Sequence, residues 1–399
     1  MNRSVMNHRL DYLDAVRAFA LLLGIVFHAS LSFVPVYIGW AVMDVSTSSF
    51  VAALTLVSHS FRMELFFLIA GFFSHMTFHK KGARTFINSR FVRIAIPFVV
   101  GWFILRPLIV SGWVMGGQSL SGDVHVWNGL VAGFQSLSQL PKDLLVGSHL
   151  WFLYYLLLIT AITLSVRALI CTNSSVRSQI LELTDSTMRW IADSRFSLLL
   201  LVIPTTGCLW FMKNWGMDTP DKSLIPHLPT LLVFGGFFSL GWILHRQKEL
   251  LERFARLNAS RIIICVGSIL ITLVLSRYQN DMGHPQHQWI RAGFSLSYAL
   301  MMWSLVALSI GLFKRYFDRP NKVVRYLADA SYWLYLVHLP IVVWLQVAFA
   351  ELPLHWSVKL SSIFLITVGV SLICYDLFVR STLIGKTLNG VKKERVFFR

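Results

Sequence analysis

The sequence is poor in charged residues. Asp, Glu, Lys and Arg make up 14% of its 399 residues, whereas about 25% is usual for a soluble domain. Apolar residues reach 55% and the mean hydropathy is +0.62. Ten spans of about 20 residues would use roughly 200 apolar residues, which is close to the apolar content of the chain and leaves few apolar residues for the core of a soluble domain. The composition therefore predicts a polytopic membrane protein.

Other absences narrow the range of functions. The four cysteines are widely spaced and mostly within apolar runs, so we expect neither a metal site nor a disulfide framework. The chain contains no P-loop, no dinucleotide fingerprint and no Gly-x-Ser-x-Gly elbow. ATP-driven transport, dinucleotide chemistry and the hydrolase nucleophile are therefore without support in the sequence.

Hydropathy predicts an all-α protein with about ten transmembrane helices that form one membrane-embedded domain, residues 1–399. Each span is an apolar run bounded by polar residues. The predicted spans are 15–40, 50–78, 95–115, 149–170, 196–212, 228–244, 262–276, 290–313, 329–348 and 360–379.

The net charge of +17 gives the expected orientation. In a soluble protein this excess of basic residues would suggest nucleic acid as a partner. Here 28 of the 36 Lys and Arg residues fall in alternate loops, on the side of the N-terminus. Because basic residues accumulate in cytoplasmic loops, both termini are predicted to be cytoplasmic. We therefore expect the lipid bilayer, and no nucleic acid, as a partner.

The longest predicted outer connection, residues 116–148, is rich in Gly, Ser and Gln. Tryptophans occur beside it at Trp113 and within it at Trp127. Exposed tryptophans in such loops often contact sugars, but they also form the aromatic belt at the membrane surface. Both interpretations stay open.

Ionisable residues inside predicted spans are functional candidates, because an unpaired charge in hydrocarbon costs several kcal/mol. In the first span, Arg17 and His28 are eleven residues apart, which is three helical turns and about 16 Å. They therefore share one face. Asp14 precedes Arg17 by three residues and is expected to pair with it.

The second span contains Arg62 and Glu64 at the same predicted depth as His28. Either side chain could orient or stabilise the imidazole, as the third member of a catalytic triad does. We predict His28, Arg62 and Glu64 as catalytic residues. The alternative is an ion pair that merely holds helices together.

Four more positions are predicted to bind substrate. His149 and Trp151 open the fourth span, where an interfacial anchor is an equally good interpretation. Tyr335 and His338 lie in the ninth span, where a lone histidine is often only a packed hydrogen-bonder.

Arg90 and Arg93 border the third span, one helical turn apart. They are either ordinary cytoplasmic charge or a clamp for an anion.

The pattern Arg17-x10-His28, the pair Arg90-x-x-Arg93 and the segment 331–340 resemble the acyltransferase 3 membrane family, which has ten spans. The resemblance covers essentially the whole chain. Further segments resemble a branch that succinylates osmoregulated periplasmic glucans. These are Leu13-Asp14-x-Val16-Arg17-Ala18, His28-x-Ser30-Leu31, His59-Ser60-Phe61-Arg62-Met63, Ser148-His149-Leu150-Trp151-Phe152-Leu153 and Leu336-Val337-His338.

Two places depart from the family pattern. Ala70-Gly71 stands where Ser-Gly is common, and Tyr375-Asp376 followed by Arg380 lacks the usual Glu and Pro.

The resemblance implies a multi-pass enzyme of the bacterial inner membrane with a cytosolic acyl-CoA donor and a periplasmic sugar acceptor. The donor is expected to be succinyl-CoA, or else acetyl-CoA, with no permanently bound cofactor. Asp14, Arg17, Arg90 and Arg93 are then expected to receive the CoA head group. The acceptor is expected to be a periplasmic glucan, and other glucan-biosynthesis proteins are potential partners.

In this hypothesis His28 removes the proton from a glucosyl hydroxyl and Arg62 stabilises the oxyanion or binds the succinyl carboxylate. Direct transfer and transfer through an acyl-histidine both stay open. The competing hypotheses are an O-acetyltransferase for lipopolysaccharide or another exported polysaccharide, a secondary transporter and a structural scaffold.

Overall fold

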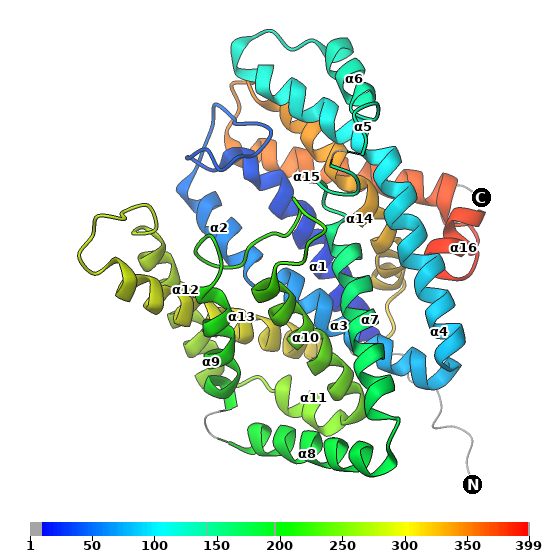
Figure 1. Cartoon of the computed structure of the whole chain (residues 1–399). Helices are drawn as coiled ribbons and strands as arrows, with labels where there is room; N and C mark the ends of the chain where they lie inside the picture. The colour runs from blue at the N-terminus through cyan, green and yellow to red at the C-terminus, as the bar shows by residue number, and fades with distance from the viewer. Residues whose placement is uncertain (1–9, 142, 195–196, 398–399) are drawn as a thin grey trace.

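The computed structural model describes residues 10–141, 143–194 and 197–397, and within them all regular structure is helical (Figure 1). The elements are α1 (Asp11–Ser30), η2 (Leu31–Phe33), α2 (Ser49–His59), α3 (Arg62–Lys81), α4 (Ala83–Arg90), η3 (Phe91–Ala95), α5 (Ile96–Gln118), η4 (Ser119–Ser121), α6 (Val126–Gln135), α7 (Trp151–Ile170), α8 (Ser174–Asp193), α9 (Ser197–Trp210), α10 (Leu228–Arg246), α11 (Lys248–Phe254), α12 (Ala259–Ser276), α13 (His287–Phe317), α14 (Lys322–Phe349), α15 (Trp356–Cys374), η5 (Tyr375–Val379) and α16 (Leu383–Asn389).

The predicted all-α membrane fold is confirmed. Nine helical segments of the described chain are long and apolar enough to cross a bilayer. The predicted span 196–212, whose first residue lies outside the described residues, corresponds to α9, with 14 residues. At about 21 Å, α9 is shorter than the hydrocarbon core of roughly 30 Å.

A tenth span is reached only if α8 and α9 are taken together as one strongly bent pair. Before α9, α8 runs across the foot of α10 (Figure 1), where Asp185 pairs with Arg246. After α9, the carbonyl oxygen of Leu224 accepts the hydroxyl of Tyr154 near the start of α7. The described residues therefore contain nine candidate spans, and α9 is too short to count as a tenth by itself.

The first helix is shorter than predicted. The hydropathy pattern predicted a span to residue 40, but α1 ends at Ser30 and one 3₁₀ turn follows. Val34 is then extended (φ −71°, ψ 132°), because the ring of Pro35 excludes a helical conformation for the residue before it. Residues 34–48 consequently fold back as a loop instead of continuing the span.

The connection 116–148 is also more ordered than a loop. It contains α6, which packs against α5 and contributes two glycines to the contact. A Cβ on Gly133 would lie 2.2 Å from the carbonyl oxygen of Pro107, so only glycine allows this approach.

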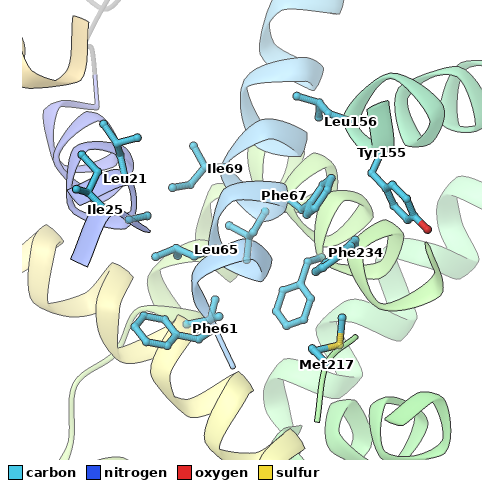
Figure 2. Packing of buried hydrophobic residues seen from close by; sticks show 14 of the residues in the cluster. Leu21, Ile25, Phe61, Leu65, Phe67, Ile69, Tyr155, Leu156, Met217 and Phe234 are labelled. Carbon is cyan, nitrogen blue, oxygen red and sulfur yellow. The ribbon is translucent and has the colours of Figure 1, made fainter. Parts of the chain in front are cut away.

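The bundle core includes buried side chains of α1, α3, α7 and α10, which Figure 2 shows from close by. Phe67 of α3 stacks on Phe234 of α10 with ring centroids 4.6 Å apart. The two helices approach closely because a Cβ on Gly71 or Gly241 would lie 1.9 Å from a carbonyl oxygen of the other helix. Gly71 follows Ala70, the residue that departs from the family pattern. The contact between α3 and α10 therefore requires Gly71 itself.

The start of α1 and the C-terminal tail (residues 389–397) lie at one end of the bundle, which we call the terminal end. Asp11 pairs with Arg325 at 3.1 Å and Lys393 pairs with Asp329 at 2.5 Å, both at the start of α14. The second departure from the family pattern has a structural role here: the carboxylate of Asp376 accepts the backbone N–H groups of residues 396 and 397 and so holds the tail.

Candidate active site

One cavity of about 640 Å³ runs into the bundle from the terminal end, between α1, α3, η3, α7 and α14. Ten of the eleven predicted site residues line it, and Glu64 does not. The ten are Asp14, Arg17, His28, Arg62, Arg90, Arg93, His149, Trp151, Tyr335 and His338. The prediction that Arg17 and His28 share one face of the first helix is confirmed, because both border this space.

The mouth of the cavity is cationic. Arg17 donates to the carbonyl oxygen of Ala328 at 2.7 Å and lies 3.5 Å from Asp14, the pair that the spacing predicted. Arg90 donates to the hydroxyl of Ser74 at 2.7 Å. Each guanidinium carries five N–H donors, so these contacts orient it and leave donors for an anion.

A π-helical turn, η3, begins directly after Arg90 and contains Arg93. Such turns insert an extra residue into a helix and often occur at functional sites. Arg93 donates from Nε to the carbonyl oxygen of Leu388 at 3.1 Å, and its own carbonyl oxygen accepts the hydroxyl of Tyr332 at 2.6 Å. Arg93 therefore joins the mouth to α16 and to α14.

The tail supplies site residues that the sequence did not reveal. Asn389 and Lys393 line the cavity mouth, and Asn389 donates to the carbonyl oxygen of Asp329 at 3.1 Å. Nothing in the sequence distinguishes Lys393 from the other basic residues near the C-terminus. Only the folding of the tail brings Lys393 to Asp329 at the cavity mouth.

Between the mouth and the deep end the wall is apolar. Its side chains include Leu21, Phe66, Ile69, Phe73 and Leu156. A wall of this kind suits an uncharged chain better than a charged one.

His338 at the deep end has a defined tautomer. Its Nδ1 lies 2.8 Å from the carbonyl oxygen of Tyr335 and 3.1 Å from that of Leu334. A carbonyl oxygen only accepts, so Nδ1 carries the proton. The buried Nε2 then has a free lone pair and no partner among the described residues.

His149 is oriented by the same helix. Its Nε2 lies 2.9 Å from the carbonyl oxygen of Tyr335 and 3.1 Å from that of Leu336. Pro340 has no N–H to donate to Leu336 four residues earlier, which leaves that carbonyl available for His149. Nε2 therefore carries the proton, and the unpartnered Nδ1 is an acceptor.

The burial of His149 contradicts the interpretation of this residue as a surface anchor: only 7% of it is exposed. Burial also lowers the pKa of His149 from its ordinary value of 6.5 to about 4, so the imidazole is neutral at physiological pH.

His28 completes the deep end. Its ring lies 5.3 Å from that of His338 between centroids, and its buried Nδ1 has no hydrogen-bond partner in the described structure. Arg62 places its guanidinium 4.1 Å from the centre of the Phe27 ring, next to His28 in the chain. Nη1 of Arg62 is buried and also unpartnered among the described residues.

Glu64 requires a correction. It is fully buried, and within the described chain neither carboxylate oxygen has a hydrogen-bond partner. The side chain does not border the cavity, so it neither orients His28 nor forms a hydrogen-bonded pair with Arg62. The prediction from depth was wrong about contact because Glu64 follows Arg62 by only two residues, and such positions face different sides of a helix.

The break between α2 and α3 places another unpredicted residue beside the site. His59, the last residue of α2, lies 5.3 Å from the Phe27 ring between centroids and 3.2 Å from the hydroxyl of Thr219. Thr219 itself lines the cavity.

The deep end therefore combines a cationic group with several imidazole lone pairs. Hydroxyl or amide donors can bind to His149 and His338, and Arg62 can bind an anion. In the described ranges, no group of three His, Cys, Asp or Glu residues is arranged to hold a metal ion.

Comparisons with known proteins identify sequences that are similar to this chain. The profile of the acyltransferase 3 family, described as an acyltransferase domain, matches residues 10–376. Similar proteins include glucans biosynthesis protein C from Escherichia coli strain K12, from strain ED1a of serotype O81 and from serotype O157:H7. Each is 25% identical over 401 residues, which cover 96% of this chain and 96% of the relative. No solved structure matches the chain.

Proposed function

The chain belongs to the acyltransferase 3 family, and on this premise we propose that it transfers a succinyl group from succinyl-CoA to glucose hydroxyls of an osmoregulated periplasmic glucan. That the protein is an acyl-transferring enzyme with membrane-spanning helices follows from the family and the fold. The donor, the acceptor, the bacterial inner membrane and the cytoplasmic location of both termini belong to the proposal. The name of the relatives supports glucan as the acceptor.

The observation that supports the proposal most strongly is a single cavity with a cationic mouth and a deep end of histidines. A CoA head group is polyanionic and suits Arg17, Arg90, Arg93 and Lys393. The pantetheine arm is a narrow chain that suits the apolar wall. The eleven residues from Arg17 to His28 give a rise of about 16 Å, which an extended pantetheine arm can bridge, so the thioester would arrive beside His28.

The orientation of the protein follows from the same charges. The terminal end carries the basic loops, so it faces the cytoplasm under the positive-inside rule. The donor then enters from the cytosol, and the acceptor approaches the deep end from the opposite side. Other glucan-biosynthesis proteins would supply that acceptor.

The transfer has a simple proton balance. Neutral His28 takes the proton from a glucosyl hydroxyl as that oxygen attacks the thioester carbonyl. The C–S bond then breaks, the CoA thiolate leaves, and the imidazolium returns the proton to the sulfur. The lone pairs on Nε2 of His338 and Nδ1 of His149 accept hydrogen bonds from hydroxyl groups of the glucan.

Arg62 is the residue that favours succinyl over acetyl. A succinyl group carries a carboxylate, which needs a cation in a water-poor cavity. Arg62 is 5% exposed and has an unpartnered nitrogen at the deep end. It therefore binds the succinyl carboxylate.

The decisive experiment uses the purified full chain in lipid nanodiscs with succinyl-CoA or acetyl-CoA and periplasmic glucan. Release of CoA thiol and glucan-bound acyl group are measured together. We expect glucan-dependent release with succinyl-CoA and its loss in His28→Ala, whereas His125→Ala, a change at an exposed histidine, leaves it intact. Transfer of acetyl alone would support the O-acetyltransferase, and solute uptake without acyl-CoA binding would support the transporter.

A further inference from the structure

The loop at residues 34–48 returns a tryptophan to the candidate catalytic histidine. The indole of Trp40 stacks on the imidazole of His28 with ring centroids 5.7 Å apart and ring planes 26° apart. His28 lines the donor cavity, but Trp40 does not. Trp40 therefore covers a side of His28 that the donor cavity does not reach.

Trp40 is held firmly in this position. Its indole N–H donates to Oε1 of Gln346 at 2.9 Å. The amide of Gln346 in turn donates to the carbonyl oxygens of His28 at 2.9 Å and Ala29 at 3.1 Å. One side chain of α14 thus fixes Trp40 relative to the helix that carries His28.

The following residues of the loop are anchored as well. Asp44 forms a buried ion pair with Lys359 at 2.6 Å. The carbonyl oxygen of Ala41 would lie 2.2 Å from a Cβ on Gly116, so the loop packs directly on the backbone of α5. The position of Trp40 is therefore built into the fold at several points.

A second tryptophan continues the aromatic surface outward. Trp113 of α5 packs edge-on against Trp40, with ring centroids 5.0 Å apart and planes at 69°. Trp113 is 37% exposed and lines a separate hollow of about 400 Å³ with Gly147. The two indoles therefore form a continuous aromatic path from His28 to the surface.

We propose that Trp113 and Trp40 form the acceptor subsite for a pyranose ring of the glucan, and that Trp40 shields one side of His28 from water. This inference rests on the proposed function. The path lies on a side of His28 away from the donor cavity, where an acceptor from the opposite membrane face has to approach.

The chemistry of a pyranose fits this path. One face of the ring presents C–H groups, which pack on the electron-rich face of an indole. Its edge presents hydroxyls, one of which can donate to the imidazole of His28 at the inner end of the path. The hydrocarbon chain of a lipid has no hydroxyl to offer His28, so we favour the sugar as the occupant.

The shielding role has a chemical reason. A thioester beside a general base is hydrolysed if water reaches it, and a covered site suppresses this side reaction. Water would then add to the carbonyl carbon, with free succinate and CoA as the products. The sugar ring packs against Trp40, which stays in place, and its hydroxyl then takes the position beside His28 that water would otherwise occupy.

The test compares two variants at each tryptophan in the nanodisc assay. We expect Trp113→Leu to raise the KM for glucan about 3- to 10-fold, with the affinity for succinyl-CoA unchanged, and Trp113→Phe to keep the wild-type KM. We expect Trp40→Leu to increase succinyl-CoA hydrolysis without glucan several-fold. The matched control is Trp127→Leu on α6, because Trp127 is 75% exposed and lies outside this path.

The outcomes separate the subsite from the function. If wild-type protein transfers succinyl but Trp113→Leu keeps its KM for glucan, the acceptor subsite is wrong. If Trp40→Leu lowers kcat without faster hydrolysis, Trp40 only packs on His28 and the shielding role is wrong. If glucan never stimulates CoA release by the wild type, the proposed function itself fails. Trp113 is partly exposed, so its variants test the subsite even if Trp40→Leu does not fold.

Discussion

The imidazoles of His28 and His338 meet at the deep end of the cavity with ring centroids 5.3 Å apart. They come from the first span and from α14, far apart in the chain. Backbone carbonyls fix the proton of His338 on Nδ1, whereas Nδ1 of His28 has no partner in the described structure. The two rings therefore suit the different tasks proposed for them: His338 as the acceptor of a hydrogen bond from a hydroxyl, and His28 as the general base.

We expect His338→Ala to lower kcat/KM for glucan about 10-fold, the effect of one lost hydrogen bond, without a change in the KM for succinyl-CoA. His28→Ala should lower kcat at least about 100-fold, because it removes a general base. Steady-state kinetics of both variants provide the measurement. An equal loss in the two variants would mean that His338 takes part in proton transfer.

Arg62→Gln is expected to change donor preference. Loss of a charge-assisted hydrogen bond to the succinyl carboxylate should lower kcat/KM for succinyl-CoA about 10- to 100-fold. Activity with acetyl-CoA, which has no carboxylate, should change little. The ratio of the two donors is the readout, and an equal loss with both would assign Arg62 to the oxyanion instead.

The cationic mouth should act on donor binding alone. We expect Lys393→Ala and Arg90→Ala to raise the KM for succinyl-CoA several-fold. Added salt should then raise this KM less in the variants than in the wild type, because one of the screened charges is missing. Lys392→Ala is the matched control, because Lys392 is exposed on the same tail and does not line the cavity. An equal effect of Lys392→Ala would show that the tail contributes only general charge.

Gly71→Ala is expected to destabilise the bundle. Its Cβ would lie 1.9 Å from the carbonyl oxygen of Phe238, which forces α3 and α10 apart. Overpacking of this kind costs about 1–3 kcal/mol or more. Gly236→Ala in α10 is the control, since a Cβ there meets no atom within 4 Å. Thermal unfolding in detergent is the measurement, and equal midpoints in the two variants would contradict the close helix contact.

His149 makes stability depend on pH. The folded protein keeps His149 neutral down to about pH 4, while the unfolded chain takes up a proton below about pH 6.5. The unfolded state therefore binds more protons in this window, and stability falls by roughly 3 kcal/mol as the pH decreases through it. We expect His149→Gln to flatten the pH dependence of the unfolding midpoint between pH 7 and 5. An unchanged slope would show that His149 is charged or accessible in the folded state.

Some of the site could be predicted because it depends on local periodicity. Arg17 and His28 lie on one helix, so their separation follows from the rise and turn per residue alone. Arg90 and Arg93 were found in the same way. Glu64 shows the limit of this reasoning: depth in the membrane follows from counting residues, but the direction of a side chain depends on how its helix is rotated against its neighbours.

Residues brought together by loops and by the tail could not be predicted. Trp40 was assigned to the upper part of the first span, yet the turn at Pro35 returns it onto His28. Lys393 reaches the cavity because Asp376 holds the tail and Lys393 itself pairs with Asp329. Such contacts join residues far apart in the chain, and no periodic pattern encodes them.

The sequence by itself determined the all-helical membrane fold, because a bilayer requires long apolar runs whose backbone groups are satisfied within a helix. It also determined which ionisable residues were candidates, since charge inside hydrocarbon is costly. Only the tertiary structure decided which of them share a cavity, which nitrogen of His149 and of His338 carries a proton, and which side of His28 is covered. These properties depend on contacts between different helices and loops, and packing in three dimensions establishes them.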